Sequence, residues 1–295
     1  MSSRVRFSPD LGAWLVEQLN GGRPPLALVE TMVAERMEPR VASAIVAAFV
    51  AARSDGRPVP TDSLLLEDEP EPYRYEPPLL APGSRLRTAD REVRVVMRSE
   101  RPCLAVLEGL LTDDECSALI ELGRPRLTPS TLVDPETGQD IVASGRTSFG
   151  MFFRPRENAL VARIDRRLSE VMGLPEENGE GLQLLHYPAL AESTPHFDFL
   201  RPTNDANRAS IERSGQRVST LLAYLNDVEA GGETLFPALG SSVSPARGRG
   251  VYFEYANSLG QVDERSLHAG GPVLSGEKWV ATKWMRRRRF VPAAH

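Results

Sequence analysis

The chain has 295 residues, of which 41% are hydrophobic and 25% are charged, an ordinary globular composition with enough apolar residues for a large core. The formal net charge is only -5 and no long charged tail is present, which argues against nucleic acid as the main partner. The chain shows no signal-peptide pattern and no run of eighteen apolar residues. With Cys103 and Cys116 too few for a disulfide framework, we expect a soluble cytoplasmic protein, without a membrane partner, whose thiols are reduced.

Residues 1–53 predict a small helical unit. Ser8 can cap a helix that begins at Pro9, and apolar residues recur on one face of this segment. Similar apolar stripes follow around Leu28 and after Pro39, which predicts three helices. Each stripe alone buries little surface, so we expect the helices to pack together or on the remainder of the chain, as a helical cap rather than a partner-binding module.

Residues 54–91 have the composition of a linker or of an extended segment that wraps around a core. Seven prolines accompany an acidic stretch at 67–71, and no apolar periodicity runs through the segment. Tyr73 and Tyr75 are the side chains best suited to dock on a core. These features place the start of the main domain at residue 92.

Residues 92–295 predict an α+β domain. A capping box, Thr112 followed by Glu115, opens one helix, and a second helix is expected over 157–171. Short strands separated by turn residues then dominate, at 182–187, 218–225, 250–255 and 278–285. Without alternating helices, these strands favour an antiparallel sandwich or barrel over a doubly wound sheet. The run at 286–289, four arginines, is interpreted as the solvated end of the last strand.

The segment TPHFDFL carries a candidate metal site. His196 and Asp198 are two residues apart, and in an extended strand such residues point to the same face. His268, in SLHAGGP, lies far enough along the chain to return on a neighbouring strand and add a second imidazole. The chain has only four histidines, so these two are not part of a general surface population. Two histidines and one carboxylate with open coordination positions suit non-haem Fe(II).

Lys278 is a second, independent feature. It begins the strand KWVATKWM, and strand alternation puts Lys278, Thr282 and Trp284 on one face. A cation inside a barrel requires an anion, because an unpaired buried charge costs several kcal/mol or shifts its pKa. The distal carboxylate of a dicarboxylic keto acid would meet that requirement.

From about Cys103 to Phe290 the chain resembles the prolyl 4-hydroxylase branch of the Fe(II)- and 2-oxoglutarate-dependent oxygenases. The matching motifs come in the family's order and are LTDDECSALI, SGRTSFGMFF, LQLLHYPAL with PHFDFL, RVSTLLAYLNDVEAGGETLFP, and SLHAGGPVLSGEKWVATKWM. The family fold is a double-stranded β-helix, or jelly roll. We therefore expect a jelly-roll core with flanking helices beside the small N-terminal helical unit.

The resemblance implies roles for single residues. It assigns His196, Asp198 and His268 as catalytic iron ligands and Lys278 as the partner of the 2-oxoglutarate carboxylate. Tyr187 and Thr234 match positions that hydrogen-bond the co-substrate. The positions near the family's substrate groove are Arg146, Ser148, Arg217 and Trp284.

The resemblance also implies the reaction. Fe(II), 2-oxoglutarate and O2 together hydroxylate a substrate C–H bond while 2-oxoglutarate is decarboxylated to succinate, and L-ascorbate rescues oxidised iron. The favoured substrate is a prolyl residue of a protein or peptide, hydroxylated at C4. The alternatives are a hydroxylase of a free amino acid or other small molecule, in which Arg146 and Arg217 would meet a substrate carboxylate, and a catalytically silent binding protein. A zinc hydrolase would have no use for Lys278. The sequence leaves the oligomeric state open.

Overall fold

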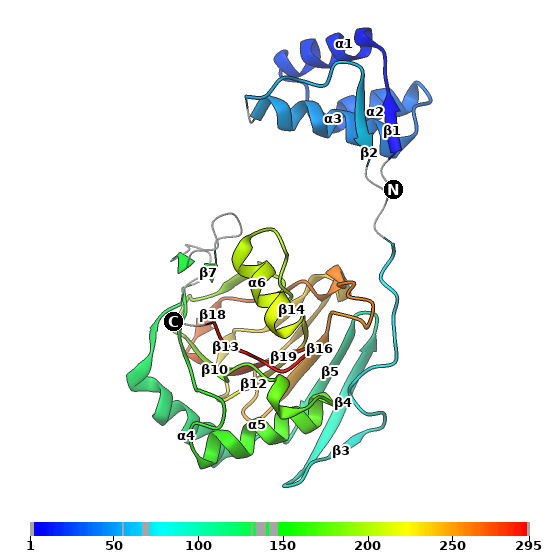
Figure 1. Ribbon diagram of the computed structural model, residues 1–295. Helices are drawn as coiled ribbons and strands as arrows, with labels where there is room; N and C mark the ends of the chain where they lie inside the picture. Colours follow the sequence, from blue (N-terminus) through cyan, green and yellow to red (C-terminus); the bar gives the residue numbers. More distant parts are fainter. Residues whose placement is uncertain are drawn as a thin grey trace. The chain divides into compact units, whose positions relative to one another are not determined.

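The computed structural model describes residues 3–54, 56–66, 71–130, 132–133, 140–141 and 147–293. The chain separates into two compact units, residues 1–72 and 73–295 (Figure 1). Each unit has its own hydrophobic core. Among the described helices, none combines the length and apolar character that crossing a membrane would require.

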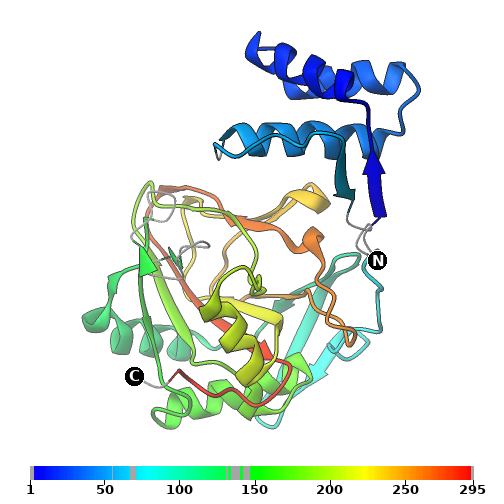
Figure 2. The same ribbon diagram turned by 45° about the horizontal axis from the view of Figure 1, so that its top comes forward.

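The smaller unit is a three-helix unit with a two-stranded antiparallel sheet (Figure 2). Its elements are β1 (Ser3–Arg6), α1 (Pro9–Asn20), α2 (Pro25–Ala34), α3 (Pro39–Ser54) and β2 (Ser63–Leu66). The Ser8 hydroxyl accepts a hydrogen bond from the Leu11 N–H at 3.2 Å, as the capping signal predicted. The three apolar stripes meet in one core that contains Leu15, Leu28 and Phe49. The two strands were not predicted.

Residues 54–91 divide between the two units, which differs from the boundary drawn on composition. Strand β2 belongs to the smaller unit, whereas 73–91 lies against the larger one. There the Tyr75 hydroxyl donates to Asp263 Oδ2 at 2.9 Å, and Leu80 is buried in the core. The larger compact unit therefore begins at residue 73 rather than 92, with an extended segment as its first part.

The larger unit contains two main antiparallel sheets (Figure 1). The first has nine strands in the order β3 (Arg85–Arg87), β4 (Glu92–Glu100), β5 (Cys103–Glu108), β16 (Gly250–Glu254), β12 (Arg217–Tyr224), β19 (Lys278–Arg286), β10 (Gln183–Tyr187), β9 (Phe149–Phe152) and β6 (Thr128–Pro129). The second has four strands in the order β11 (Ser193–His196), β17 (His268–Gly270), β14 (Thr234–Phe236) and β15 (Ser241–Val243). Two short pairs join β13 (Ala230–Gly231) to β18 (Val273–Ser275) and β7 (Leu132–Val133) to β8 (Asp140–Ile141).

The chain alternates between these two sheets as it runs from β10 to β19. Strands β10, β12, β16 and β19 lie in the nine-stranded sheet, and β11, β14 and β17, which come between them in the chain, lie in the four-stranded sheet. Such alternation closes two sheets around one interior and defines a jelly roll. The predicted fold class, α+β with a double-stranded β-helix core, is confirmed.

Helices cover the outer face of the nine-stranded sheet (Figure 1). They are α4 (Asp113–Gly123) and α5 (Ala159–Met172), while α6 (Asp205–Ser214) lies between β11 and β12 in the chain. Both hydrogen bonds of the predicted capping box at Thr112 are present. Gly123 lets α4 approach the sheet closely, because a Cβ there would lie 2.0 Å from Leu184 Cδ2. Single turns of 3-10 helix occur at Arg124–Arg126, Glu176–Asn178, Pro237–Leu239 and Glu264–Ser266.

Strand β19 is buried along its whole length because helices cover one face and the interior of the jelly roll the other. The arginine run at 286–289 is only in part the solvated strand end that the sequence suggested, because Arg288 and Arg289 are exposed and Arg286 is buried. The Arg286 side chain is buried and donates to Glu180 Oε1 at 3.0 Å, and Arg288 Nη2 donates to the carbonyl oxygen of Ile211 in α6 at 3.2 Å. Arg286 and Arg288 therefore tie the end of the sheet to α6.

Candidate active site

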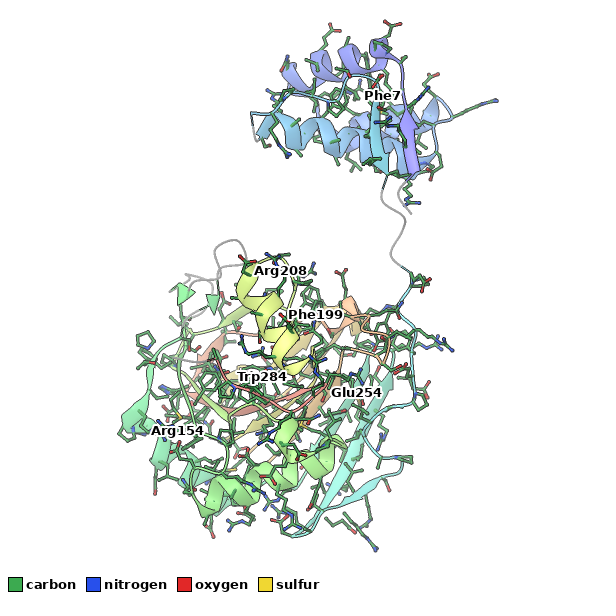
Figure 3. The ribbon with its side chains drawn as sticks, viewed as in Figure 1. Phe7, Arg154, Phe199, Arg208, Glu254 and Trp284 are labelled. Atoms are coloured by element: carbon green, nitrogen blue, oxygen red, sulfur yellow. The ribbon has the colours of Figure 1, made fainter. Side chains whose placement is uncertain are left out.

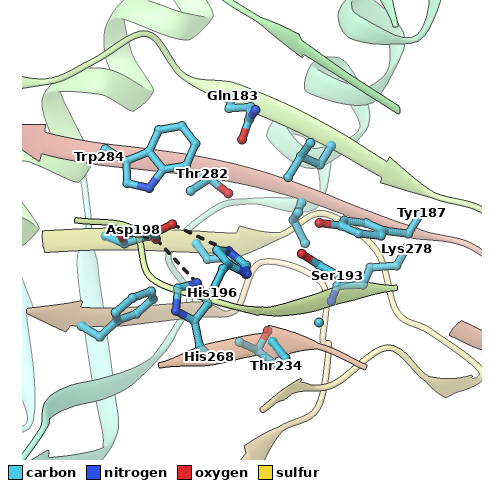
Figure 4. Close-up of a pocket in the computed structure, with 17 residues that line it drawn as sticks. Gln183, Tyr187, Ser193, His196, Asp198, Thr234, His268, Lys278, Thr282 and Trp284 are labelled. Atoms are coloured by element: carbon cyan, nitrogen blue, oxygen red, sulfur yellow. Dashed lines mark hydrogen bonds and ion pairs between the residues drawn. The ribbon is translucent and has the colours of Figure 1, made fainter. Parts of the chain in front are cut away.

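Three metal-binding side chains converge between the two sheets (Figure 4). His196 ends β11 and His268 begins β17, and the two residues are direct partners in the antiparallel pairing of these strands. Asp198 Oδ1 lies 3.8 Å from His196 Nε2, and Asp198 Oδ2 lies 3.6 Å from His268 Nε2. One ligand atom from each residue falls within 4.8 Å of the other two. The predicted metal set is thus assembled at one point, with one imidazole from each of two paired strands.

Backbone carbonyls fix the orientation of both imidazoles. His196 Nδ1 lies 2.8 Å from the carbonyl oxygen of Thr194, and His268 Nδ1 lies 3.0 Å from that of Ser266. A protonated Nδ1 donates in each case, which leaves Nε2 with a lone pair for a metal. Asp198 differs from the prediction in one respect, because β11 ends at His196 and the carboxylate comes from the bend that follows.

The Asp198 carboxyl is buried, and burial alone would raise its pKa. The positive charge that His268 and His196 acquire on protonation, together with a hydrogen bond from Thr220, outweighs that effect and lowers the pKa to about 2. The group is therefore an ionised, acceptor-only ligand at neutral pH.

Lys278 lies at one end of the same pocket and is 3% exposed. Among the described residues, no carboxylate oxygen lies within 4.0 Å of its Nζ, which instead lies over the rings of Tyr187 and Tyr224 at 5.2 and 5.7 Å. Burial lowers the pKa of Lys278 to about 8, although the negative charge of Glu233 opposes the shift. A buried ammonium in such surroundings is a site for an anionic ligand.

Hydroxyl groups gather around Lys278 (Figure 4). Tyr187 is its cross-strand partner on β10, and the side chains of Thr234 and Ser193 line the same end of the pocket. Thr234 Oγ1 lies 2.6 Å from the Tyr224 hydroxyl, which donates in turn to the carbonyl oxygen of Val243. Both predicted co-substrate residues thus lie beside Lys278. The Tyr187 hydroxyl can donate to a carboxylate, whereas the Thr234 hydroxyl uses its single hydrogen on Tyr224 in this arrangement. Ser193 was missed, because a small polar residue two positions before a proline gives no signal in the sequence.

Trp284 lines the other end of the pocket, and Figure 3 shows it inside the larger unit. It lies on β19 on the same face as Lys278, Val280 and Thr282, as strand alternation predicted. Phe152, which is 51% exposed, lies 6.3 Å away between ring centroids. Gln183 also lines this end, and its Oε1 is buried without a hydrogen-bond partner among the described residues. Gln183 was missed too, although its position four residues before Tyr187 on β10 could have placed it on the pocket face.

Arg217 lies behind Trp284 rather than in the pocket. Its guanidinium is 4.2 Å from the Trp284 ring centroid and makes two hydrogen bonds to Glu180, of 2.7 and 2.8 Å. Burial would lower the pKa of Arg217, but the Glu180 carboxylate outweighs this effect and raises it. A third hydrogen bond, of 3.2 Å, goes to the carbonyl oxygen of Asp198. Arg217 therefore holds the backbone of a metal ligand.

Two further predicted residues are Ser148 and Arg146. Ser148 is buried, donates to the Ser130 hydroxyl at 3.0 Å and is not among the residues that line the pocket. Arg146 lies outside the described residues. Their assignment to a substrate groove stays a prediction.

The pocket fits Fe(II) and 2-oxoglutarate on the chemistry of its side chains. His196, Asp198 and His268 provide the two imidazoles and one carboxylate that non-haem Fe(II) oxygenases use. Lys278, a buried cation without a carboxylate partner among the described residues, would hold the distal carboxylate of the keto acid. The bound iron and keto acid would supply the oxygen-activating chemistry.

Comparison with known proteins gives the same assignment. The family model of the 2OG-Fe(II) oxygenase superfamily matches residues 182–286, which contain the metal set and Lys278. Prolyl 4-hydroxylase 1 of Arabidopsis thaliana is 39% identical over 218 residues, which cover 69% of this chain and 75% of that protein. The chain belongs to the prolyl 4-hydroxylase family of Fe(II)- and 2-oxoglutarate-dependent oxygenases. It is accordingly a 2-oxoglutarate-dependent dioxygenase.

Other relatives in this family match the same region. Probable prolyl 4-hydroxylase 7 of Arabidopsis thaliana is 35% identical, and the match covers 67% of this chain and 66% of that protein. Prolyl 4-hydroxylase subunit alpha-2 of Gallus gallus is 36% identical, with 64% of this chain and 35% of that protein covered. Among solved structures, the 2OG complex of a viral collagen prolyl hydroxylase from Paramecium bursaria Chlorella virus-1 is 28% identical, covers 62% of this chain and 95% of that chain, and has a TM-score of 0.49.

Proposed function

We propose that this prolyl 4-hydroxylase relative hydroxylates C4 of a prolyl residue within a protein or peptide. The reaction consumes 2-oxoglutarate and O2 and yields succinate and CO2. The names of the relatives point to proline as the target. The state of Arg217 favours a peptide over a free amino acid.

A free amino acid has a carboxylate and an ammonium group, and both need partners when they are desolvated. Lys278 is the only lysine or arginine among the described residues that line the pocket, and 2-oxoglutarate would occupy it. Arg217, the described candidate for a second carboxylate, already forms a bidentate pair with Glu180. A prolyl residue within a peptide brings no charged groups of its own and needs no second cation.

In this reaction the side chains of the pocket would position the substrate ring and exclude water, and none of them needs to donate a proton. Trp284 and Phe152 offer aromatic surface beside the metal set, where a pyrrolidine ring can pack. The buried Oε1 of Gln183 offers a hydrogen-bond acceptor at the same end of the pocket. Fixing one ring carbon near the reactive centre and excluding water are the contributions that such side chains can make.

We further propose L-ascorbate as the reductant that restores iron oxidised in uncoupled turnovers, and a cytoplasmic location for the reaction. The location rests on the composition and on the two free cysteines, Cys103 and Cys116.

The test of the reductant is to leave it out. Omitting ascorbate should shorten the period of linear succinate release without changing its initial rate. Cell fractionation with an antibody to the protein tests the location.

The test of the substrate is a direct competition between peptide and free amino acid. The full chain is incubated with Fe(II), 2-oxoglutarate and ascorbate, together with either a library of proline-containing peptides or free L-proline. We expect succinate release and a gain of one oxygen by mass spectrometry with peptides, and separation of the hydrolysed products should identify 4-hydroxyproline. Hydroxylation of free L-proline with all peptides unmodified would reject the proposal in favour of the small-molecule alternative.

A further inference from the structure

The carboxylate of Asp198 is held by a hydroxyl group from the opposite sheet. Thr220, in the middle of β12, donates to Asp198 Oδ2 at 2.6 Å. The same Thr220 oxygen lies 3.0 Å from the Tyr255 hydroxyl. Thr220 and Tyr255 are 1% and 0% exposed, so neither hydroxyl can exchange its partner for bulk water.

The chemistry of these groups fixes the direction of both hydrogen bonds. An ionised carboxylate only accepts hydrogen bonds, so the single hydroxyl hydrogen of Thr220 must be donated to Asp198. The contact between Thr220 and Tyr255 then requires Tyr255 to be the donor. The result is a directed chain from Tyr255 to Thr220 to Asp198.

Asp198 needs such support more than the two histidines do. His196 and His268 lie on paired strands, and a backbone carbonyl orients each ring. Asp198 follows the end of β11, so no sheet pairing fixes its side chain. Among the described residues, Thr220 is the only hydrogen-bond donor to its carboxylate, and Asp198 Oδ1 accepts none. Oδ2 is therefore held and Oδ1 left for a metal.

We propose that Thr220, supported by Tyr255, is a positioning residue that sets the orientation of the Asp198 carboxylate for metal binding. Thr220 lies in the central part of the nine-stranded sheet, with Trp284 as its partner on β19 and Phe253 as its partner on β16. The two hydroxyls thus anchor Asp198, which follows a strand of the four-stranded sheet, to the nine-stranded sheet. Partners of this kind typically change metal affinity about 10- to 100-fold when they are removed.

The test measures metal affinity without turnover. Co(II) is titrated into the metal-free full chain, and its visible absorption reports both affinity and the ligand environment. Thr220→Val removes the hydroxyl at constant shape, and we expect Co(II) affinity to fall about 10- to 100-fold with altered absorption bands. Thr220→Ser retains the donor and should restore affinity to within about threefold of the wild type. Tyr255→Phe removes only the outer hydrogen bond and should give a smaller loss than Thr220→Val.

Thr282→Val is the matched control, because Thr282 lines the same pocket without a hydrogen bond to Asp198. Its Co(II) affinity and absorption should match those of the wild type. Circular dichroism and the melting temperature of each metal-free variant identify any that fail to fold. If Thr220→Val is one of them, the Co(II) affinities of Tyr255→Phe and Thr220→Ser provide the test instead. Equal affinities for Thr220→Val and the wild type, or an equal loss in Thr282→Val, would overturn the proposal. A wild-type chain that binds no Co(II) would overturn the metal site as well.

Discussion

Strand β19 carries two buried lysines that face opposite sides, and their surroundings differ. Lys283 faces the helices, where its Nζ donates to Asp165 Oδ1 at 2.7 Å and to the carbonyl oxygen of Glu180 at 2.6 Å. Lys278 faces the pocket, where no carboxylate oxygen of the described residues lies within 4.0 Å of its Nζ. The fold neutralises the first cation itself and leaves the second for a ligand. A buried lysine is therefore informative about function only once its partners are known.

Removing a metal ligand should abolish catalysis in the pocket that Lys278 faces. His196→Ala takes one of the two imidazoles from the metal set while leaving both lysines in place. We expect succinate release from 2-oxoglutarate to fall to background, because the keto acid can be activated only on bound metal. The measurement is succinate formation at saturating Fe(II), with bound metal determined in parallel. Activity retained with His196→Ala would show that the site lies elsewhere.

Lys283→Met tests the helix-facing side. The substitution leaves the buried Asp165 carboxylate without a cation, with the backbone N–H of Arg156 as a remaining donor at 3.1 Å. Breaking a buried pair in this way costs about 3–5 kcal/mol of unfolding free energy. Urea denaturation measures the loss, and the affinity for 2-oxoglutarate should stay at the wild-type value. A loss below about 1 kcal/mol would contradict the structural role assigned to this pair.

Lys278→Met is the matching change on the pocket side. In contrast to Lys283→Met, it should weaken the binding of 2-oxoglutarate without lowering the stability of the protein. We expect 2-oxoglutarate affinity to weaken by about 2–5 kcal/mol, or roughly 30- to 5000-fold, because the ligand carboxylate loses its buried cation. Without ligand, the variant should be as stable as the wild type or more stable at pH 7, since the unpaired charge is gone. Calorimetric titration of 2-oxoglutarate and urea denaturation of the metal-free protein measure the two quantities. Unchanged affinity would remove Lys278 from the co-substrate site.

The sequence predicted the metal set from the residue types and their spacing, and it predicted the face of β19 from strand periodicity. The alternation from Lys278 to Trp284 is local geometry that any extended segment shares. The two-residue spacing of His196 and Asp198 led to the metal set as well, although Asp198 lies on the bend after β11 and not in the strand. The family resemblance then supplied the jelly roll, which the alternation of strands between two sheets confirms.

Pairing across strands could not be predicted in this way. The bond between Arg217 and Glu180 joins residues 37 positions apart, and no local pattern distinguishes this arginine from one that binds substrate. Thr220 and Ser193 acquire their importance only from what faces them across the interior. The capping box at Thr112 was predicted correctly, whereas α6 has a weak apolar stripe and was missed.

The pH dependence of 2-oxoglutarate binding gives the smallest and most specific test of the difference between the two lysines. Burial lowers the pKa of Lys278 to about 8 in the ligand-free protein, and the negative charge of Glu233 opposes this shift. A bound carboxylate favours the charged form and raises the pKa in the complex. Below about pH 8 the lysine is already protonated, so affinity should be nearly constant between pH 7 and that value. Above it, binding takes up a proton, and affinity should fall by up to about tenfold per pH unit.

Calorimetric titrations at several pH values above 7, in buffers of different ionisation enthalpy, measure both the affinity and the protons taken up. Lys278→Met is the control, because its weak binding should not follow this pH profile. Lys283→Met should retain the full profile, since Lys283 is paired with Asp165 on the opposite face and does not line the pocket. A wild-type affinity that stays constant to pH 9.5, or a profile shared by Lys278→Met, would mean that the ligand carboxylate is not held by a lysine that titrates, and the two faces of β19 would then not differ as proposed.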